Sequence, residues 1–232
     1  MKNLIFKFFF LLFIYLRSIS TEKIPEYLSI ETETSLVREN VYDFIRKAME
    51  TLILSYPDDS QIQNDYIKIF NSKGLSLSKF REPNSWHTTC LYIGKNYSQL
   101  NSYIYKNFEE GREINLSTST FLYIPNKIMT SPVFIENFNL IDNKYPHITL
   151  MISKFRAVDS NYLLKSLFDN DPELSLLFRE GKIESDEQLL NIKKKNVKIF
   201  FEDLNKSEYV DKVYILKNGD VLNLNGITKK NY

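Results

Sequence analysis

The chain has little of the residue types that usually mark a specialised architecture. Its single cysteine, Cys90, excludes an intrachain disulfide. Six glycines and seven prolines in 232 residues exclude a low-complexity chain, and no repeat of fixed period indicates a solenoid. Two histidines and one cysteine are too few ligands for a zinc site, and no glycine-rich phosphate loop is present. Any chemistry must therefore come from a few side chains, without a metal or cofactor.

The sequence also lacks an excess of charge of either sign. The whole chain has 30 basic and 29 acidic residues, a net charge of +1. Without the first twenty residues, which hold Lys2, Lys7 and Arg17, 27 basic residues face 29 acidic ones, so the net charge is about −2. A non-specific nucleic-acid binder needs a surplus of lysine and arginine. The net charge of about −2 therefore excludes that class of protein. The basic run 193–195 with Lys198 is typical of a solvated face.

The first twenty residues have the layout of a secretory signal peptide. Lys2 and Lys7 precede the apolar run 8–16, and small residues at 18–20 predict cleavage after Ser20. The run is shorter than the roughly 20 residues of a membrane span. We therefore predict a secreted or secretory-pathway protein, with an uncleaved membrane anchor as the alternative. Three sequons, at Asn96, Asn115 and Asn205, are acceptors only if the protein is secreted.

Residues 21–232 are predicted to form a single bilobal domain, with a core large enough to need no disulfide, and we expect a monomer. Hydrophobic periodicity predicts helices over 36–53, 62–70, 97–108 and 158–168, so that 21–80 is a helical N-terminal part. Strands are predicted over 87–93, 114–124, 127–135, 145–153, 197–201, 213–216 and 221–224. Asn218 and Gly219 predict a hairpin turn between the last two strands. Paired strands with helices beside them favour an α+β fold with antiparallel sheet.

The two histidines share one local pattern, because each is followed two residues later by threonine. On a strand, residues two apart point to the same face, so His147 and Thr149 project together, as do His87 and Thr89. By composition alone the chance that both histidines carry Ser or Thr there is about 2%. The pattern therefore indicates a paired site rather than two structural histidines.

These two motifs, His87-Thr88-Thr89 and His147-Ile148-Thr149, about 60 residues apart, resemble the signatures of the two-histidine (2H) phosphoesterase superfamily. The stretch 145–150 is the best match, and the resemblance covers about 85–224. It implies a bilobal α+β fold in which two antiparallel sheets form a concave cleft with helices outside. It also implies a metal-independent phosphodiesterase acting on a 2′,3′-cyclic phosphate, or a related phosphodiester, of RNA ends or nucleotides.

The residues fit such chemistry independently. Imidazole titrates nearest to neutral pH, so one histidine can activate water and the other can protonate the leaving oxygen. The sequence does not show which histidine is the base and which is the acid. Thr89 and Thr149 can donate hydrogen bonds to the phosphate. Trp86 and Tyr145, beside the motifs, are candidates for stacking on a base. Cys90 points to the opposite strand face from His87, which favours a buried thiol over a nucleophile.

Two other functions remain open on the sequence. The same cleft could belong to an inactive module that binds nucleotides or RNA ends, or the chain could be a secreted protein-interaction domain. The separation of the imidazoles discriminates between them: about 5 to 8 Å lets both reach one phosphate, whereas histidines buried apart favour the interaction domain.

Overall fold

The computed structural model describes residues 23–71, 80–136, 139–171 and 192–232. Its strands form one antiparallel sheet of eight, six of them in the order β2, β1, β8, β3, β4, β6, with β5 beside β3 and β7 beside β8. The strands are β1 (Tyr27–Thr32), β2 (His87–Tyr92), β3 (Glu113–Ile124), β4 (Ile128–Pro132), β5 (Phe134–Ile135), β6 (His147–Ile152), β7 (Ile192–Phe201) and β8 (Lys206–Asn231). The helices are α2 (Thr34–Ser55), α3 (Ser60–Tyr66), α4 (Tyr103–Asn107) and α5 (Asp159–Asp169).

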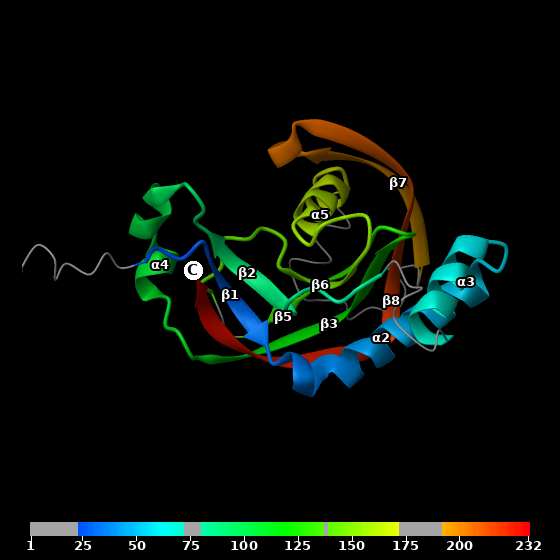
Figure 1. The fold of residues 1–232 in the computed structure, drawn as a ribbon, viewed down its shortest axis with the longest axis horizontal. Helices are drawn as coiled ribbons and strands as arrows, with labels where there is room; N and C mark the ends of the chain where they lie inside the picture. Colours follow the sequence, from blue (N-terminus) through cyan, green and yellow to red (C-terminus); the bar gives the residue numbers. More distant parts are fainter. Residues whose placement is uncertain (1–22, 72–79, 137–138, 172–191) are drawn as a thin grey trace, which may run out of the picture.

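Strand β8 is the longest strand and joins the two halves of the sheet. Its last part pairs with β1 and with the start of β3, and its first part pairs with β7 and with the end of β3. Figure 1 shows the result: β7 and the first part of β8 arch over α5, whereas the end of β8 runs beside β1. Gly226 lies where β8 passes β1 closely, because a Cβ there would come within 2.5 Å of the Ile30 side chain.

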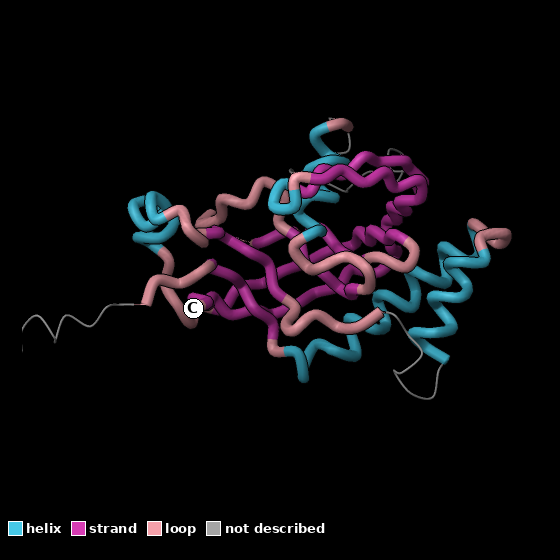
Figure 2. The backbone as a smooth tube through the Cα atoms, turned by 45° about the horizontal axis from the view of Figure 1, so that its top comes forward, coloured by secondary structure: helices cyan, strands magenta, loops and turns pink. Residues whose placement is uncertain are grey.

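The sheet curves strongly (Figure 2), and hydrogen bonds connect the segments of its two outer strands, β2 and β6. The indole Nε1 of Trp86, just before β2, donates a hydrogen bond to the Leu150 carbonyl on β6 at 3.0 Å. The Asp142 amide, before β6, donates to the Cys90 carbonyl on β2 at 2.8 Å. The two contacts run in opposite order along the two segments, as expected for antiparallel neighbours. The sheet is therefore a nearly closed, barrel-like arrangement.

Two hydrophobic cores lie on the two faces of the sheet. On β3, alternate residues serve different cores: Phe121 and Tyr123 pack into the first, Leu122 and Ile124 into the second. The first core includes one side of α2, whose buried residues are Val37, Val41, Phe44, Ile45, Ala48, Met49 and Leu52. Their steps of three and four residues place them on one helix face. The second core includes the buried residues of α5 and of the β7–β8 hairpin.

Most predicted elements are confirmed within a few residues. The α+β class with antiparallel sheet is confirmed, as are α2, α5 and the strands around both histidines. The stretch 62–70 is divided between α3 and a π-helical turn, Ile67–Asn71, and the stretch 97–108 between a 3-10 turn, Tyr97–Asn101, and α4. The strands form one continuous sheet where the resemblance implied two.

Two expectations for the strands are wrong. The hairpin at 218–219 does not form, because Leu216 and Leu222 both pair with β3 and the register only shifts between them. The chain continues across an irregularity in one strand instead of reversing. The N-terminal part, predicted to be helical, also contributes β1, which lies between β2 and β8 in the sheet.

The predicted signal segment, residues 1–20, lies outside the described residues, so its role stays a prediction. None of the helices in the described ranges has both the length and the apolar character that a membrane span requires.

The Trp86–Leu150 contact is predicted to stabilise the closure of the sheet. Replacing Trp86 by Phe removes the indole donor, leaves the Leu150 carbonyl without it and reduces side-chain volume in a fully buried position. We expect the free energy of unfolding to fall by about 2–3 kcal/mol, measured by urea denaturation with circular dichroism. The control is Tyr92→Phe, at a ring that is 62% exposed, which should change stability little. Equal stabilities of the two variants would contradict this role.

Candidate active site

The two histidines begin the two outer strands of the sheet. His87 is the first residue of β2 and His147 is the first residue of β6. Although five strand-to-strand steps separate them through the sheet, its closure brings β2 and β6 together. The two imidazoles lie close enough for the charge of His87 to lower the pKa of His147. The structure thus brings the predicted pair together.

The His147 ring is held by hydrogen bonds at both nitrogens and is only 6% exposed. Nδ1 lies 2.8 Å from the Tyr145 carbonyl oxygen, and Nε2 lies 2.9 Å from Ser160 Oγ at the start of α5. Ser160 Oγ also lies 2.8 Å from Thr149 Oγ1 and bonds to the Ala157 carbonyl. His147, Thr149 and Ser160 therefore form one hydrogen-bonded group between β6 and α5.

His87 is less enclosed. Its Nδ1 lies 3.3 Å from the Ser85 carbonyl oxygen and 3.0 Å from Ser85 Oγ. Its ring stacks on the ring of Tyr27 on β1, with centroids 5.6 Å apart and planes inclined by 27°. Nε2 has no hydrogen-bond partner among the described residues, so it is the nitrogen available to a ligand.

Both histidines thus follow the same rule at Nδ1, which faces the carbonyl of the residue two positions earlier. A carbonyl oxygen only accepts, so the Tyr145 carbonyl places the proton of neutral His147 on Nδ1 and leaves Nε2 unprotonated. At His87 the Ser85 carbonyl favours the same tautomer, and the Ser85 hydroxyl at Nδ1 can accept from it or donate to it. A serine hydroxyl can donate to that Nε2 or accept from it once it is protonated. Ser160 can therefore serve both protonation states of His147.

Burial lowers the pKa of both imidazoles. For His147 burial is the largest cause, the Tyr145 carbonyl opposes it, the charge of His87 adds to it, and the pKa is about 4. For His87 burial again dominates and lowers the pKa below 6.5, while the nearby Glu31 carboxylate raises it and Lys229 lowers it. Both rings are consequently neutral at pH 7 in the free protein, and a bound phosphate anion would raise both pKa values.

The two threonines lie on the same strand faces as their histidines. Thr149 belongs to the Ser160 group described above. Thr89 is half-buried, pairs with Ser29 on β1, and its hydroxyl has no hydrogen-bond partner in the described ranges. Thr88, on the other face, is buried with an unpaired hydroxyl. Thr89 is therefore the free donor near His87.

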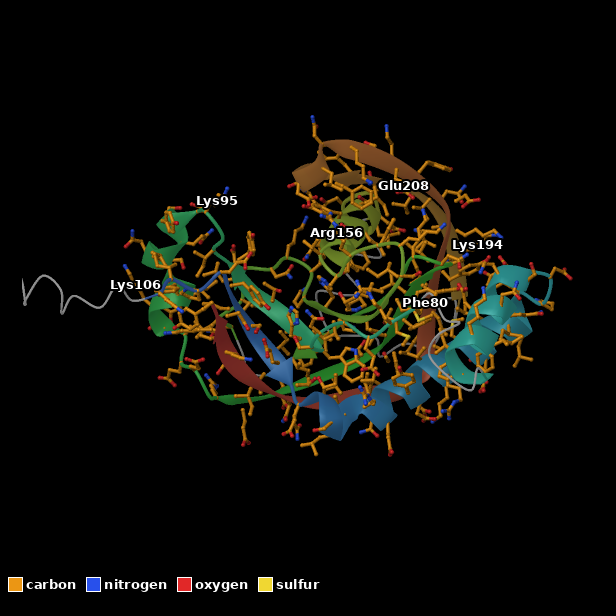
Figure 3. All side chains as sticks on the ribbon, viewed as in Figure 1. Phe80, Lys95, Lys106, Arg156, Lys194 and Glu208 are labelled. Atoms are coloured by element: carbon orange, nitrogen blue, oxygen red, sulfur yellow. The ribbon has the colours of Figure 1, made fainter. Side chains whose placement is uncertain are left out.

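Charged residues also reach this face of the sheet. Glu31 pairs with His87 across the β1–β2 ladder, and its carboxylate binds Lys229 Nζ of β8 at 2.9 Å. Figure 3 shows Arg156 at the start of α5, but its guanidinium is bound by Asp159 and Asp203. Lys95 and Lys106 lie on the arm around α4, away from α5 (Figure 3). Lys229 is therefore a cation whose charge reaches His87, and it lowers the pKa of that imidazole.

Trp86 and Tyr145, the two candidates for stacking on a base, are both buried. The Trp86 ring is 1% exposed and belongs to the first core, so it has no free face for a base. The Tyr145 ring is 7% exposed, lies against Phe168 and donates its hydroxyl to Asp169 at 2.7 Å. Both rings stabilise the strands that carry the histidines. Cys90 is fully buried, as expected, and burial raises the pKa of its thiol to about 12.

Sequence reasoning missed Ser160, Tyr27, Glu31 and Lys229. The stretch 158–160 was expected to begin a helix, which is correct, but the Ser160 hydroxyl bonds to His147 rather than capping the helix. Tyr27, Glu31 and Lys229 lie on strands that become neighbours of β2 only in the folded sheet. In the described part of the chain, no three His, Cys, Asp or Glu side chains gather into a group that could hold a metal ion.

Comparison with known proteins finds a similarity of fold. No family model and no curated protein matches the sequence. A solved structure described as a fungal RNA kinase resembles the fold, with a TM-score of 0.50 and 14% identity over 92% of this chain. The chain spans 47% of the length of that protein, less than half of it. At this identity the similarity concerns the fold alone.

The low pKa of His147 predicts that stability depends on pH. The unfolded chain takes up a proton near pH 6.5, whereas the folded chain does so only near pH 4, so the stabilisation present above pH 6.5 is lost as the pH falls toward 4. The difference corresponds to roughly 3 kcal/mol. Urea denaturation at pH 7 and pH 4 should therefore show a smaller pH dependence in His147→Asn than in the unchanged protein.

The matched control for this measurement is His87→Asn, which removes the other imidazole and keeps the His147 contribution. If His147→Asn and the unchanged protein lose the same free energy between the two pH values, the imidazole of His147 is not held neutral by the fold.

Proposed function

We propose that this chain is a metal-independent phosphodiesterase that hydrolyses 2′,3′-cyclic phosphates or related phosphodiesters of nucleotides or RNA ends. The observation that carries the proposal is the common arrangement of the two histidines. They are the only histidines of the chain, they meet from opposite edges of the sheet, and both present Nε2 because Nδ1 faces a carbonyl. Two neutral imidazoles beside two threonines can bind and cleave a phosphodiester without a metal.

The pKa values favour one assignment of roles. His147, whose pKa of about 4 keeps the ring unprotonated at neutral pH, is assigned as the base, and its Nε2 accepts a proton from water while the water oxygen attacks phosphorus. Burial lowers the pKa of His87 too, but the Glu31 carboxylate opposes this shift and a bound phosphate anion favours the protonated ring, so His87 is assigned as the acid whose Nε2–H gives a proton to the leaving ribose oxygen. Thr89 and Thr149 donate hydrogen bonds to the non-bridging oxygens.

The fold of an RNA kinase neighbour supports an RNA-related substrate but not kinase activity for this chain. A nucleotide-dependent kinase of the P-loop type holds its phosphates with a glycine-rich loop, which this sequence lacks. The similarity also extends over less than half of that neighbour. We propose a bilobal cleft in which β2 carries one half of the site and β6 the other, as in the 2H phosphoesterases that the motifs resemble.

A second candidate function is that of an inactive module that binds nucleotides or RNA ends in the same cleft. One observation favours it: Nε2 of His147 is bound to Ser160, and the ring is nearly buried. For catalysis, the Ser160 hydroxyl must leave Nε2 to the attacking water. The Ala157 carbonyl, which Ser160 already contacts, offers it an alternative acceptor. The interaction domain, in contrast, requires histidines that lie apart.

The first test replaces each histidine by Asn, whose side-chain amide retains a donor for the carbonyl at Nδ1. With 2′,3′-cyclic nucleotides and RNA ending in a 2′,3′-cyclic phosphate, in the presence of EDTA, we expect kcat/KM to fall by about 10²–10⁴-fold in either variant. Thr89→Val and Thr149→Val should each cost about 10²-fold. Undiminished turnover in both histidine variants excludes the proposal, and tight binding of nucleoside monophosphates without any turnover favours the inactive module.

The pH dependence of kcat/KM gives an independent test, because this constant reports the groups of the free enzyme. We expect a bell-shaped profile in the acidic range, with its lower limb near pH 4 from His147 and its upper limb below pH 6.5 from His87. His87→Asn should lose the upper limb in its residual activity. A profile that rises through pH 8 contradicts the assignment of the two imidazoles as base and acid.

A further inference from the structure

A polar hollow lies on the histidine face of the sheet, outside the site described so far. Its volume is about 320 Å³, and its side chains come from β3, β5 and β8. The polar and aromatic side chains that line it are those of Asn115, Ser117, Phe134, Glu136, Asn223 and Asn225. No lysine or arginine lines it.

Strand register places the hollow on the same face as both histidines. From β2, His87 pairs with Glu31, and Glu31 pairs with Ile227 of β8. Asn225 and Asn223 precede Ile227 by two and four residues, so they lie on the same face of β8. From β6, His147 pairs with Pro132, and Phe134 lies two residues further along the chain. Both routes across the sheet thus lead from a histidine to the hollow.

The hollow is close enough to His147 for one ligand to occupy both. Two residues of strand span about 7 Å and neighbouring strands lie about 5 Å apart, so Phe134 lies roughly 9 Å from His147 along the backbone. On the other side, Ser117 pairs with both Phe134 and Asn223, which makes the aromatic ring and the amides neighbours. A nucleotide with its phosphate at His147 can therefore extend its base toward Phe134.

The side chains of the hollow are available for binding. The amides of Asn115, Asn223 and Asn225 have no hydrogen-bond partner among the described residues, although all three lie on paired strands. The Phe134 ring is 51% exposed beside them. An aromatic face offers stacking to a planar ring, and each amide offers both donors and an acceptor to its edge.

The charge of the hollow indicates which group it binds. Glu136 is its one charged side chain, so a phosphate is repelled there, whereas an amino group is attracted as a hydrogen-bond donor. Adenine, guanine and cytosine carry an exocyclic amino group and uracil does not. A planar, uncharged ring with an amino group satisfies the aromatic ring, the amides and the carboxylate together.

We propose that this hollow binds the nucleobase of the nucleotide whose phosphate lies between His87 and His147, and that it favours bases with an exocyclic amino group over uracil. This inference rests on the proposed function. Phe134 stacks on the base, the amides of Asn223 and Asn225 bind its edge, and Glu136 accepts a hydrogen bond from the amino group.

The test compares the four nucleoside 2′,3′-cyclic phosphates and base-free ribose 2,3-cyclic phosphate as substrates. The unchanged protein should show kcat/KM at least ten-fold higher for the amino-bearing bases than for uridine. Phe134→Ala should lower kcat/KM for all four nucleotides by about ten-fold, mainly through KM, and Glu136→Gln should remove the discrimination against uridine. Neither change should affect the base-free substrate. Phe200→Ala is the matched control, because that ring is 47% exposed on β7, outside the hollow.

Binding measurements separate this inference from the proposed function. If no cyclic phosphate is turned over, calorimetry with AMP, GMP, CMP and UMP still tests the hollow. Weaker binding of UMP than of the other three nucleotides, and equal binding of all four by Glu136→Gln, support the base site although the hydrolase proposal is excluded. If cyclic phosphates are turned over with equal kcat/KM for all bases, and Phe134→Ala behaves like Phe200→Ala, the hollow is not a base site and the hydrolase proposal stands.

Discussion

The pairing of β8 with both β1 and β3 is the constraint on which the rest of the structure depends. Without β8 the sheet consists of two fragments, β2 with β1 and β3 with β4, β5 and β6, and each fragment carries one histidine. The sequence order places β8 after all other strands, yet it lies in the middle of the sheet. The site therefore depends on contacts between residues about 200 positions apart, such as Tyr27 with Asn231. Such long-range pairing is slow to form, because loop-closure entropy must be overcome before the contacts exist.

The second constraint is the environment that the closed sheet gives to the imidazoles. Burial makes the charged forms unfavourable, and the backbone carbonyls two residues earlier fix the tautomers. The same strand geometry thus orients each ring and keeps it neutral. The two sides of the site nevertheless differ: His147 shares its Nε2 with Ser160 in a nearly closed environment, whereas His87 stacks on Tyr27 and keeps Nε2 free. This asymmetry gives a physical basis for different roles, which the two similar motifs do not.

Local patterns in the sequence predicted most elements and the positions of the histidines, because strand parity and helical periodicity act over a few residues. The alternation at 147–152 identified β6, and the steps of three and four residues identified α2. The features that were missed depend on neighbours in space. Asn218 and Gly219 have the chemistry of a hairpin turn, but β3 is long enough to pair with both flanking segments, so the chain crosses a register shift in one strand instead of reversing. Trp86 beside a motif suggested a ligand contact, whereas the closure of the sheet buries it. Ser160 became part of the site only because α5 begins over β6.

The position of Trp86 has a consequence for the study of this protein. It is the only tryptophan of the chain, its indole N–H bonds to Leu150, and it directly precedes His87. When the protein is excited at the red edge of its absorption, the fluorescence comes from Trp86. It thus originates from the junction between the two strands that carry the histidines. The fluorescence of this single tryptophan therefore reports on the point where the two halves of the sheet meet, because opening of that junction would expose the indole to water.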